Sequence, residues 1–198
     1  MFNDKCSMIN PPKLILASAS PRRAEILKAV GWEYEKQIAD IDETELPGEN
    51  PADYVQRLAR EKAFAVAANH QNALVLGADT IVVIENQIIG KPKDLTDARR
   101  MLKMLSGNWH EVLTGIALIK ITEGNAETKI DLQRTRVKFA ELSDAEIEFL
   151  VQKGAPLDKA GAYAVQAQAA LFIEQIQGDY WNVVGLPVNL VFRLLQTF

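Results

Sequence analysis

"ALVLGADTIVVI", Ala73–Ile84, decides the fold, because an apolar run of this kind has to be buried. It is too short to span a membrane, and Asp79 interrupts it. We predict a strand, a break and a second strand, followed by a turn at Glu85–Gln87 and a short returning strand. The run therefore belongs to the core of a sheet.

A strand and a helix are predicted near the start of the chain. The apolar segment Lys13–Ala17 is typical of a buried parallel strand. A helix then begins at Pro21, with Ser20 as its N-cap and Gly31 just beyond its end. The acidic stretch 32–50 predicts a long loop, or a strand that leads into a loop.

Further helices and strands follow along the chain. We expect a helix from Asn50 and Pro51 to about Asn69, and a helix capped by Thr96 and closed by Gly107. Strands are expected over 110–121 and 128–142. They are followed by a helix that begins with a capping box of Ser143 and Glu146 and stops at Gly154, a mixture of strand and turn over 162–187, and a terminal helix from Pro187. The pattern predicts an α/β fold with a mixed sheet flanked by helices, arranged as two lobes with a cleft between them.

The composition is that of an ordinary globular protein, with 48% hydrophobic and 24% charged residues among 198. The formal net charge of −4 argues against binding to nucleic acid or to an anionic membrane. The single cysteine, Cys6, excludes a disulfide framework and a multi-cysteine metal site. Residues 1–12 lack the features of a signal peptide, so we expect a flexible N-terminal leader and a cytoplasmic protein.

The first turn of the helix from Pro21 carries Arg22 and Arg23. The N-terminal end of a helix dipole is positive, so each arginine opposes it by roughly 0.3–1 kcal/mol at an exposed position. Because the whole chain is acidic, a polyanionic ligand would have to be met by a local cationic pocket. We interpret the two arginines as part of such a pocket, in which the missing negative charge belongs to the ligand.

Two charged residues fall at positions where apolar residues are expected. Lys62 lies on the apolar face of its helix, and it either reaches solvent along its own stem or meets a buried anion. Asp79 either bonds its own backbone in a turn, or binds a metal, meets a cation or moves a proton. Glu43, in the acidic stretch, is either solvated or part of the same site.

Lys91 and Gln166 are weaker candidates when they are taken alone. Lys91 lies in "GKP" directly after the predicted hairpin, where surface turns often look alike. Gln166 ends "PLDKAGAYAVQ", and a lone glutamine at a strand edge is usually exposed. The loops GxxxxGK[ST] and GxGxxG are absent, and His110 does not begin an HExxH motif.

Taken together, these residues suggest one site. Helix amides, two arginines and two lysines would hold a polyphosphate, while Asp79 and Glu43 would supply oxygen ligands for a hard divalent cation or a base for water. The cationic residues are Arg22, Arg23, Lys62 and Lys91.

Six motifs then carry a family resemblance: "LILASASPRRAEIL", "GADTIVV", "GKP", "MLKMLSGNWHEVLTG", "PLDKAGAYAVQ" and "IQGDYWNVVGLPV", in that order. From about Leu14 to its end, the chain resembles the Maf family of nucleoside triphosphate pyrophosphatases. The resemblance implies an elongated mixed sheet related to that of the inosine triphosphate pyrophosphatases, and one domain with two lobes over 13–198. It also implies hydrolysis of a nucleoside triphosphate to monophosphate and pyrophosphate with Mg²⁺ or Mn²⁺, a homodimer and a housecleaning role.

The resemblance also assigns roles to residues. Asp79 would be the proton acceptor and, with Glu43, a metal ligand. Glu43, Lys62 and Lys91 would also be catalytic. The substrate-binding residues would be Ser18, Arg22, Arg23, Thr80 and Gln166. The positions that correspond to substrate selectivity in the family are Arg22, Thr80 and Gln166.

At these selectivity positions the chain resembles the branch that acts on dTTP and UTP. A glutamine amide both donates and accepts hydrogen bonds, which matches the O4 and N3–H edge of uracil or thymine. Modified pyrimidine nucleotides are included among the expected substrates. Ala167 and Ala169 stand where the family commonly has glycine, which bears on base selectivity. Two alternatives stay open: a pyrophosphatase for 7-methyl-GTP, and a nucleotide-sensing inhibitor of cell division without turnover.

Overall fold

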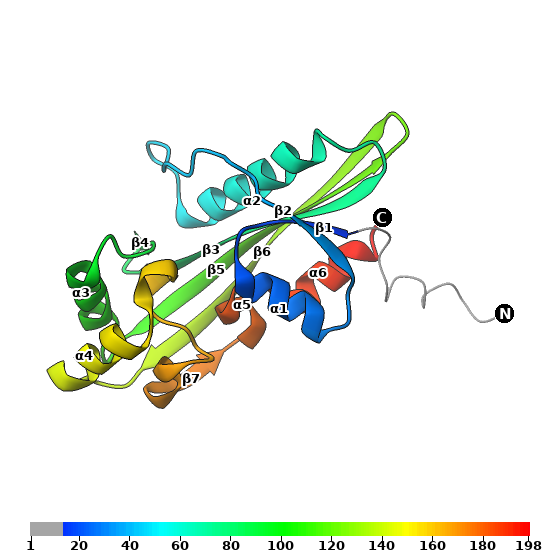
Figure 1. The fold of residues 1–198 in the computed structure, drawn as a ribbon. Coiled ribbons are helices and arrows are strands. Elements are labelled where there is room, and N and C mark those ends of the chain that lie inside the picture. The colour runs from blue at the N-terminus through cyan, green and yellow to red at the C-terminus, as the bar shows by residue number, and fades with distance from the viewer. Residues whose placement is uncertain (1–13) are drawn as a thin grey trace. The chain divides into compact units, whose positions relative to one another are not determined.

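The computed structural model describes residues 14–198 (Figure 1). The predicted leader over 1–12, Cys6 and Lys13 lie outside the described residues. The strands are β1 (Leu14–Ala17), β2 (Tyr34–Gln37), β3 (Ala73–Ile84), β4 (Gln87–Ile89), β5 (Trp109–Thr122), β6 (Asn125–Phe139) and β7 (Ile173–Gln177). The helices are α1 (Pro21–Ala29), α2 (Pro51–Ala67), α3 (Leu95–Leu105), α4 (Asp144–Lys153), α5 (Tyr180–Val184) and α6 (Val188–Leu195), with the short 3-10 helices η2 (Pro156–Asp158), η3 (Ala160–Ala162) and η4 (Gln168–Leu171).

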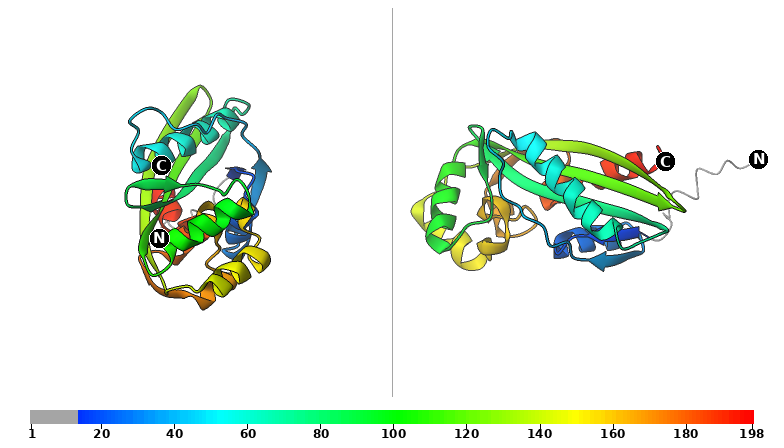
Figure 2. Two further views of the ribbon diagram at one scale, coloured as in Figure 1. Left: turned by 90° about the vertical axis from the view of Figure 1, so that its left-hand side faces the viewer. Right: turned by 90° about the horizontal axis from the view of Figure 1, so that it is seen from above.

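The strands form a mixed sheet in the order β2-β1-β3-β5-β6-β7, and β4 pairs with β3. β1 is parallel to both β2 and β3, whereas β4 and β7 are antiparallel to their partners β3 and β6. β5 and β6 are neighbours joined by a tight turn, and they run side by side in both views of Figure 2. The predicted α/β fold with a mixed sheet flanked by helices is confirmed.

The described chain divides into two compact units, and β3, β5 and β6 contribute residues to both. The first unit comprises the described residues 14–79 together with 114–133 and 185–198, and it holds the parallel strands with α1, α2 and α6. The second unit comprises 80–113 and 134–184, with β4, β7, α3, α4 and α5. The expectation of a single domain over 13–198 stays a prediction.

In the first unit, α1 and α2 lie on opposite faces of the sheet (Figure 1). β1 leads through α1 to its neighbour β2, and β2 leads through α2 back across β1 to β3. Connections between parallel strands are right-handed, so a reversal of direction along the sheet moves the second helix to the other face. At such a reversal, open α/β sheets bind ligands beyond the carboxyl ends of their strands.

Helix α2 packs directly on the strands through two glycines. A Cβ at Gly77 in β3 would lie 2.1 Å from the carbonyl oxygen of Ala59, and one at Gly115 in β5 would lie 2.3 Å from that of Val55. Small residues on the helix, including Ala59 and Ala63, join the core cluster beneath it. Since backbone touches backbone at two points, the height of α2 above the sheet is fixed.

The second unit has an aromatic cluster around a buried histidine. His110 Nε2 and the Tyr163 hydroxyl share a hydrogen bond of 2.8 Å, and the Tyr163 and Phe139 rings meet edge to face. Burial lowers the pKa of His110 to about 3, so the ring is neutral near pH 7 and serves the core. Asn182 of α5, a short helix that sequence patterns did not predict, donates through Nδ2 to Val112 O at 2.9 Å.

Two local predictions are wrong. No break occurs at Asp79, because alternating side chains let the carboxylate leave one face of β3 while the backbone continues its ladder. Asp94, not Thr96, caps α3, since its backbone is extended and its side chain accepts from Asp97 N.

Within the described residues, no helix combines the length and hydropathy needed to cross a membrane.

Most helix boundaries are confirmed. α1 begins at Pro21 and ends before Gly31, and Asn50 caps α2 by accepting from two backbone amides. The capping box of Ser143 and Glu146 opens α4, and α6 follows Pro187. These boundaries were readable because capping is a local interaction between residues close in sequence.

The close packing of α2 predicts that Gly115→Ala destabilises the protein. The new methyl group would overlap the backbone of α2, which costs about 1–3 kcal/mol. The midpoint of thermal unfolding should fall by several degrees. Gly90→Ala is the control, because a Cβ there meets nothing within 4 Å. Equal midpoints for the two variants would contradict the direct backbone contact.

Candidate functional site

Three segments of the first unit meet at the same edge of the sheet. Ala17, the last residue of β1, pairs with Gln37 in β2 and with Gly77 in β3. β1 and β2 stop there, whereas β3 continues, so Asp79 lies just beyond the last of these pairs. Since the carboxyl ends of parallel strands share an edge, the segments after β1 and β2 start beside Asp79.

Lys62 links two of these segments. It is 9% exposed on the buried face of α2, and its Nζ donates to Asp79 Oδ1 at 2.6 Å and pairs with Glu43 Oε1 at 2.7 Å. Asp79 is 8% exposed, whereas half of the Glu43 side chain is exposed. The lysine therefore meets a buried anion, and the alternatives of a solvent-reaching lysine and a turn aspartate are wrong.

Arg23 is buried at the start of α1 and organises the segment after β1. Its Nε donates to Gly185 O and its Nη1 to Ser18 Oγ, both at 2.9 Å. Burial lowers the pKa of Arg23 from its ordinary value, and the negative charge of Asp79 opposes that shift. The guanidinium therefore lies within the electrostatic reach of the carboxylate.

Ser18, rather than Ser20, makes the side-chain contact at this helix start. Ser20 occupies the N-cap position but makes no capping bond with its side chain. Ser18 Oγ instead accepts from Ser20 N at 3.2 Å and from Arg23. The first turn of α1 contains no acidic residue, and Arg22 is half-buried there. This end of α1 is therefore cationic, as its sequence predicts.

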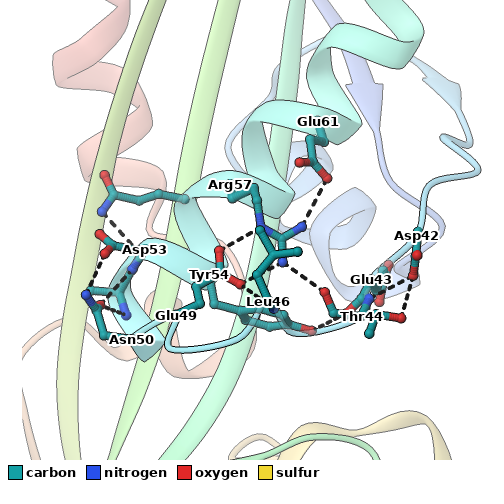
Figure 3. A network of polar contacts seen from close by, with 12 residues as sticks. Asp42, Glu43, Thr44, Leu46, Glu49, Asn50, Asp53, Tyr54, Arg57 and Glu61 are labelled. Carbon is teal, nitrogen blue, oxygen red and sulfur yellow. Dashed lines mark hydrogen bonds and ion pairs between the residues drawn. The ribbon is translucent and has the colours of Figure 1, made fainter.

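The segment after β2 is tied to α2 by two residues that sequence reasoning missed (Figure 3). The Tyr54 hydroxyl donates to Glu43 O at 2.8 Å, and Arg57 Nη2 donates to Thr44 O at 3.0 Å. Burial and nearby carboxylates raise the pKa of Tyr54 to about 12, so the hydroxyl keeps its proton. One signal was available: Tyr54 and Arg57 lie on α2, between one and about two turns before Lys62.

Three of the predicted site residues belong to the second unit. Thr80 follows Asp79 in β3 and is half-buried, and Lys91 is exposed after β4. Gln166 is exposed in the turn between η3 and η4, so its predicted place at a strand edge is wrong: the backbone there turns and forms no ladder. Gly161 N donates to Gly90 O at 3.0 Å, which joins the "GKP" segment to the one that leads to Gln166.

The structure thus brings six predicted residues together within the first unit. They are Ser18, Arg22, Arg23, Glu43, Lys62 and Asp79. A cationic helix start lies beside a pair of carboxylates that share one ammonium group. Such an arrangement can hold a polyanion next to an acceptor for a proton.

The carboxylates also fit a hard divalent cation. Among residues 14–198, no cluster of three or more histidine, cysteine, aspartate or glutamate side chains forms a closed metal site. Asp79 and Glu43 nevertheless present oxygens to one point, now taken by Lys62 Nζ. One or two carboxylates completed by water and substrate phosphate oxygens is the usual way in which Mg²⁺ is bound.

Relatives with the same length are found among curated proteins. The chain is 46% identical over 186 residues to the dTTP/UTP pyrophosphatase of Bacillus cytotoxicus, covering 94% of this chain and 95% of that protein. It is 49% identical over 185 residues to the dTTP/UTP pyrophosphatase of Anaeromyxobacter dehalogenans, covering 93% of both.

Solved structures with the same fold are more distant in sequence. The Ham1 protein of Staphylococcus aureus matches with a TM-score of 0.55 and 16% identity, over 94% of this chain and 99% of that one. The HAM1 protein of Coxiella burnetii matches with a TM-score of 0.52 and 16% identity, over 95% of this chain and 100% of that one. These likenesses show the fold.

A family model described as Maf-like protein matches residues 13–198. The match takes in β1 with the arginines that follow it, the strand of Asp79 and both units of the fold. The near full-length relatives point the same way. With its motifs, its sheet and its relatives in agreement, this chain belongs to the Maf family.

Proposed function

We propose that this protein hydrolyses dTTP and UTP to the nucleoside monophosphate and pyrophosphate. The observation that carries the proposal is the cationic start of α1 beside the carboxylates of Asp79 and Glu43, joined through Lys62. Relatives of 46–49% identity over nearly the whole chain are named dTTP/UTP pyrophosphatases, which supports the same substrates here.

Phosphate binding is assigned to the start of α1 and to two lysines. Arg22 and Arg23, with the backbone amides of the helix, neutralise the phosphates, and Lys62 and Lys91 add positive charge. Ser18 Oγ already accepts two hydrogen bonds, which uses both of its lone pairs. Its O–H can therefore donate to a phosphate oxygen.

Hydrolysis proceeds by in-line attack of water on the α-phosphorus. A bond forms between the water oxygen and that phosphorus, and the bond from the phosphorus to the α–β bridging oxygen breaks. The Asp79 carboxylate accepts the water proton, and the bridging oxygen leaves with the pyrophosphate. Cationic side chains stabilise the charge that grows on this leaving group.

A divalent cation, Mg²⁺ or Mn²⁺, is proposed to be held by Asp79 and Glu43. When bound, it offsets phosphate charge and lowers the pKa of water. Lys62 keeps the two carboxylates close together while each carries a negative charge. The positive charge of the lysine thus offsets the repulsion between the two carboxylates and holds them in place.

Selectivity for the base is assigned to Gln166, with Thr80 and Arg22. The amide of Gln166 can donate to O4 and accept from N3–H of a pyrimidine. Its exposure in a turn leaves it available to a ligand. The family resemblance supports further proposals of a homodimer, a cytoplasmic location and a single domain with two lobes over 13–198. The net charge of −4 argues against nucleic acid as a partner.

The proposed function is tested first by its products. Purified protein is incubated with a panel of canonical and modified nucleoside triphosphates, 7-methyl-GTP included, with Mg²⁺ or Mn²⁺. We expect dTTP and UTP to yield monophosphate and pyrophosphate fastest. Binding of nucleotide without release of pyrophosphate would favour the sensor alternative instead, and preference for 7-methyl-GTP would favour the other branch.

Asp79→Asn should lower kcat with dTTP at least about 100-fold, because an amide cannot accept the proton of the attacking water. The assay is run at saturating metal and scores pyrophosphate. Asp131→Asn, at an exposed aspartate on β6, is the matched control and should retain full activity. Near-normal turnover by the Asp79 variant would refute its role as base.

Gln166→Glu should lower the kcat/KM ratio of dTTP to GTP about 10-fold, because a carboxylate no longer donates to O4 of thymine but can accept from both N1–H and N2–H of guanine. The measurement is a competition between the two triphosphates. Gln168→Glu, two residues along in η4, carries the same change of charge and should leave the ratio unaltered. A preserved pyrimidine preference in the Gln166 variant would contradict the assignment.

A further inference from the structure

Glu43 lies in a segment that has no regular secondary structure to hold it. Residues 38–50 connect β2 to α2 without a helix or strand, and most of their side chains are exposed. The Glu43 side chain itself is 53% exposed. An exposed acidic segment would move away from Asp79 unless something fixed its backbone.

Arg57 of α2 holds that segment at two points, the side chain of Glu49 and the backbone carbonyl of Thr44. Its guanidinium donates from Nε to Glu49 Oε1 at 2.6 Å and from Nη2 to Glu49 Oε2 at 2.7 Å, a bidentate pair. Nη2 also donates to Thr44 O at 3.0 Å, directly after Glu43. The Arg57 and Glu49 side chains are only 13% and 8% exposed, so solvent screens this pair weakly.

Additional hydrogen bonds form within the segment and between the segment and α2. Leu46 N donates to Glu49 Oε2 at 3.2 Å, and Glu49 N donates to Leu46 O at 3.0 Å. The Tyr54 hydroxyl, one helical turn before Arg57, donates to the carbonyl of Glu43 itself at 2.8 Å. Figure 3 shows these contacts converging on one side of α2.

We propose that Arg57 and Tyr54 are positioning residues that hold the Glu43 segment against α2, so that the Glu43 carboxylate meets Lys62 beside Asp79. The inference deepens the proposed hydrolysis and rests on it. A single helix then supplies both the lysine and the contacts that hold its second partner. A planar guanidinium suits this role, because its rigid fork of N–H groups spans both carboxylate oxygens and also reaches the carbonyl, whereas the ammonium of a lysine acts as a compact point charge.

The first test is a double-mutant cycle with Glu43. Arg57→Gln alone should lower kcat with dTTP about 10-fold, since small displacements of a positioned group cost rates of this order. In the Glu43→Gln background the same change should cost less than about 2-fold, because Arg57 acts through Glu43. Equal losses in the two backgrounds would overturn the inference.

The chain offers a matched control in the second unit. Arg99 makes the same bidentate pair with Glu148, at 2.7 and 2.9 Å, on α3 and α4. Arg99→Gln should keep kcat within about 2-fold while removing an ion pair of the same bidentate geometry, although this pair is more exposed, at 39% for each side chain. If Arg99→Gln lowers kcat as much as Arg57→Gln does, Arg57 has only a general structural role, and the inference fails.

The second test is independent of activity. Hydrogen exchange followed by mass spectrometry should show faster exchange over 42–50 in Arg57→Gln and in Tyr54→Phe, but not in Arg99→Gln. Tyr54→Phe removes one hydroxyl and keeps the ring, so it retains the test should Arg57→Gln not fold. Unchanged exchange over 42–50 in Tyr54→Phe would overturn the inference.

The two readouts separate this inference from the proposed function. A wild-type protein that releases no pyrophosphate from any triphosphate overturns the function and, with it, the catalytic purpose of the contacts. An active wild type with additive losses in the cycle, or with unchanged exchange, overturns the positioning role alone.

Discussion

One ammonium group shared by two carboxylates is the interaction on which the site depends. Lys62 pairs with Asp79 and with Glu43, and both the lysine and the aspartate are buried. A buried charge that loses its partner costs about 3–5 kcal/mol, so the lysine and the aspartate each require the other. The three residues come from a helix, a strand and an irregular segment, and only the folded first unit assembles them.

The distance between α2 and the sheet sets this geometry. The helix contacts the sheet backbone at Gly77 and Gly115, and the side chain of Ala63, next to Lys62, would lie 2.9 Å from a Cβ at Gly77. A helix raised by one methyl group would carry the Nζ of Lys62 away from Asp79. The charge arrangement at the edge of the sheet therefore depends on the close packing of small residues in the core.

The cationic side of the site follows from the winding of the sheet. Because the chain reverses its direction along the sheet after β2, the start of α1 and the strand of Asp79 face the same edge. Arg23 is fixed there by bonds to Ser18 and to Gly185 O, the latter from a part of the chain far away in sequence. The helix start thus adds its positive potential for a polyphosphate to the charge of Lys62.

The sequence by itself determined the α/β class, most helix boundaries and the family, because hydrophobic period, capping and motif order are properties of neighbouring residues. It also marked Asp79 and Lys62 as charges in apolar surroundings. Only the tertiary structure decided that these two residues pair across 17 positions, and that β3 runs through Asp79 without a break. It alone showed that Tyr54 and Arg57 hold the segment of Glu43. Such contacts depend on how far a helix lies from a sheet and on which strand ends share an edge, and packing sets both.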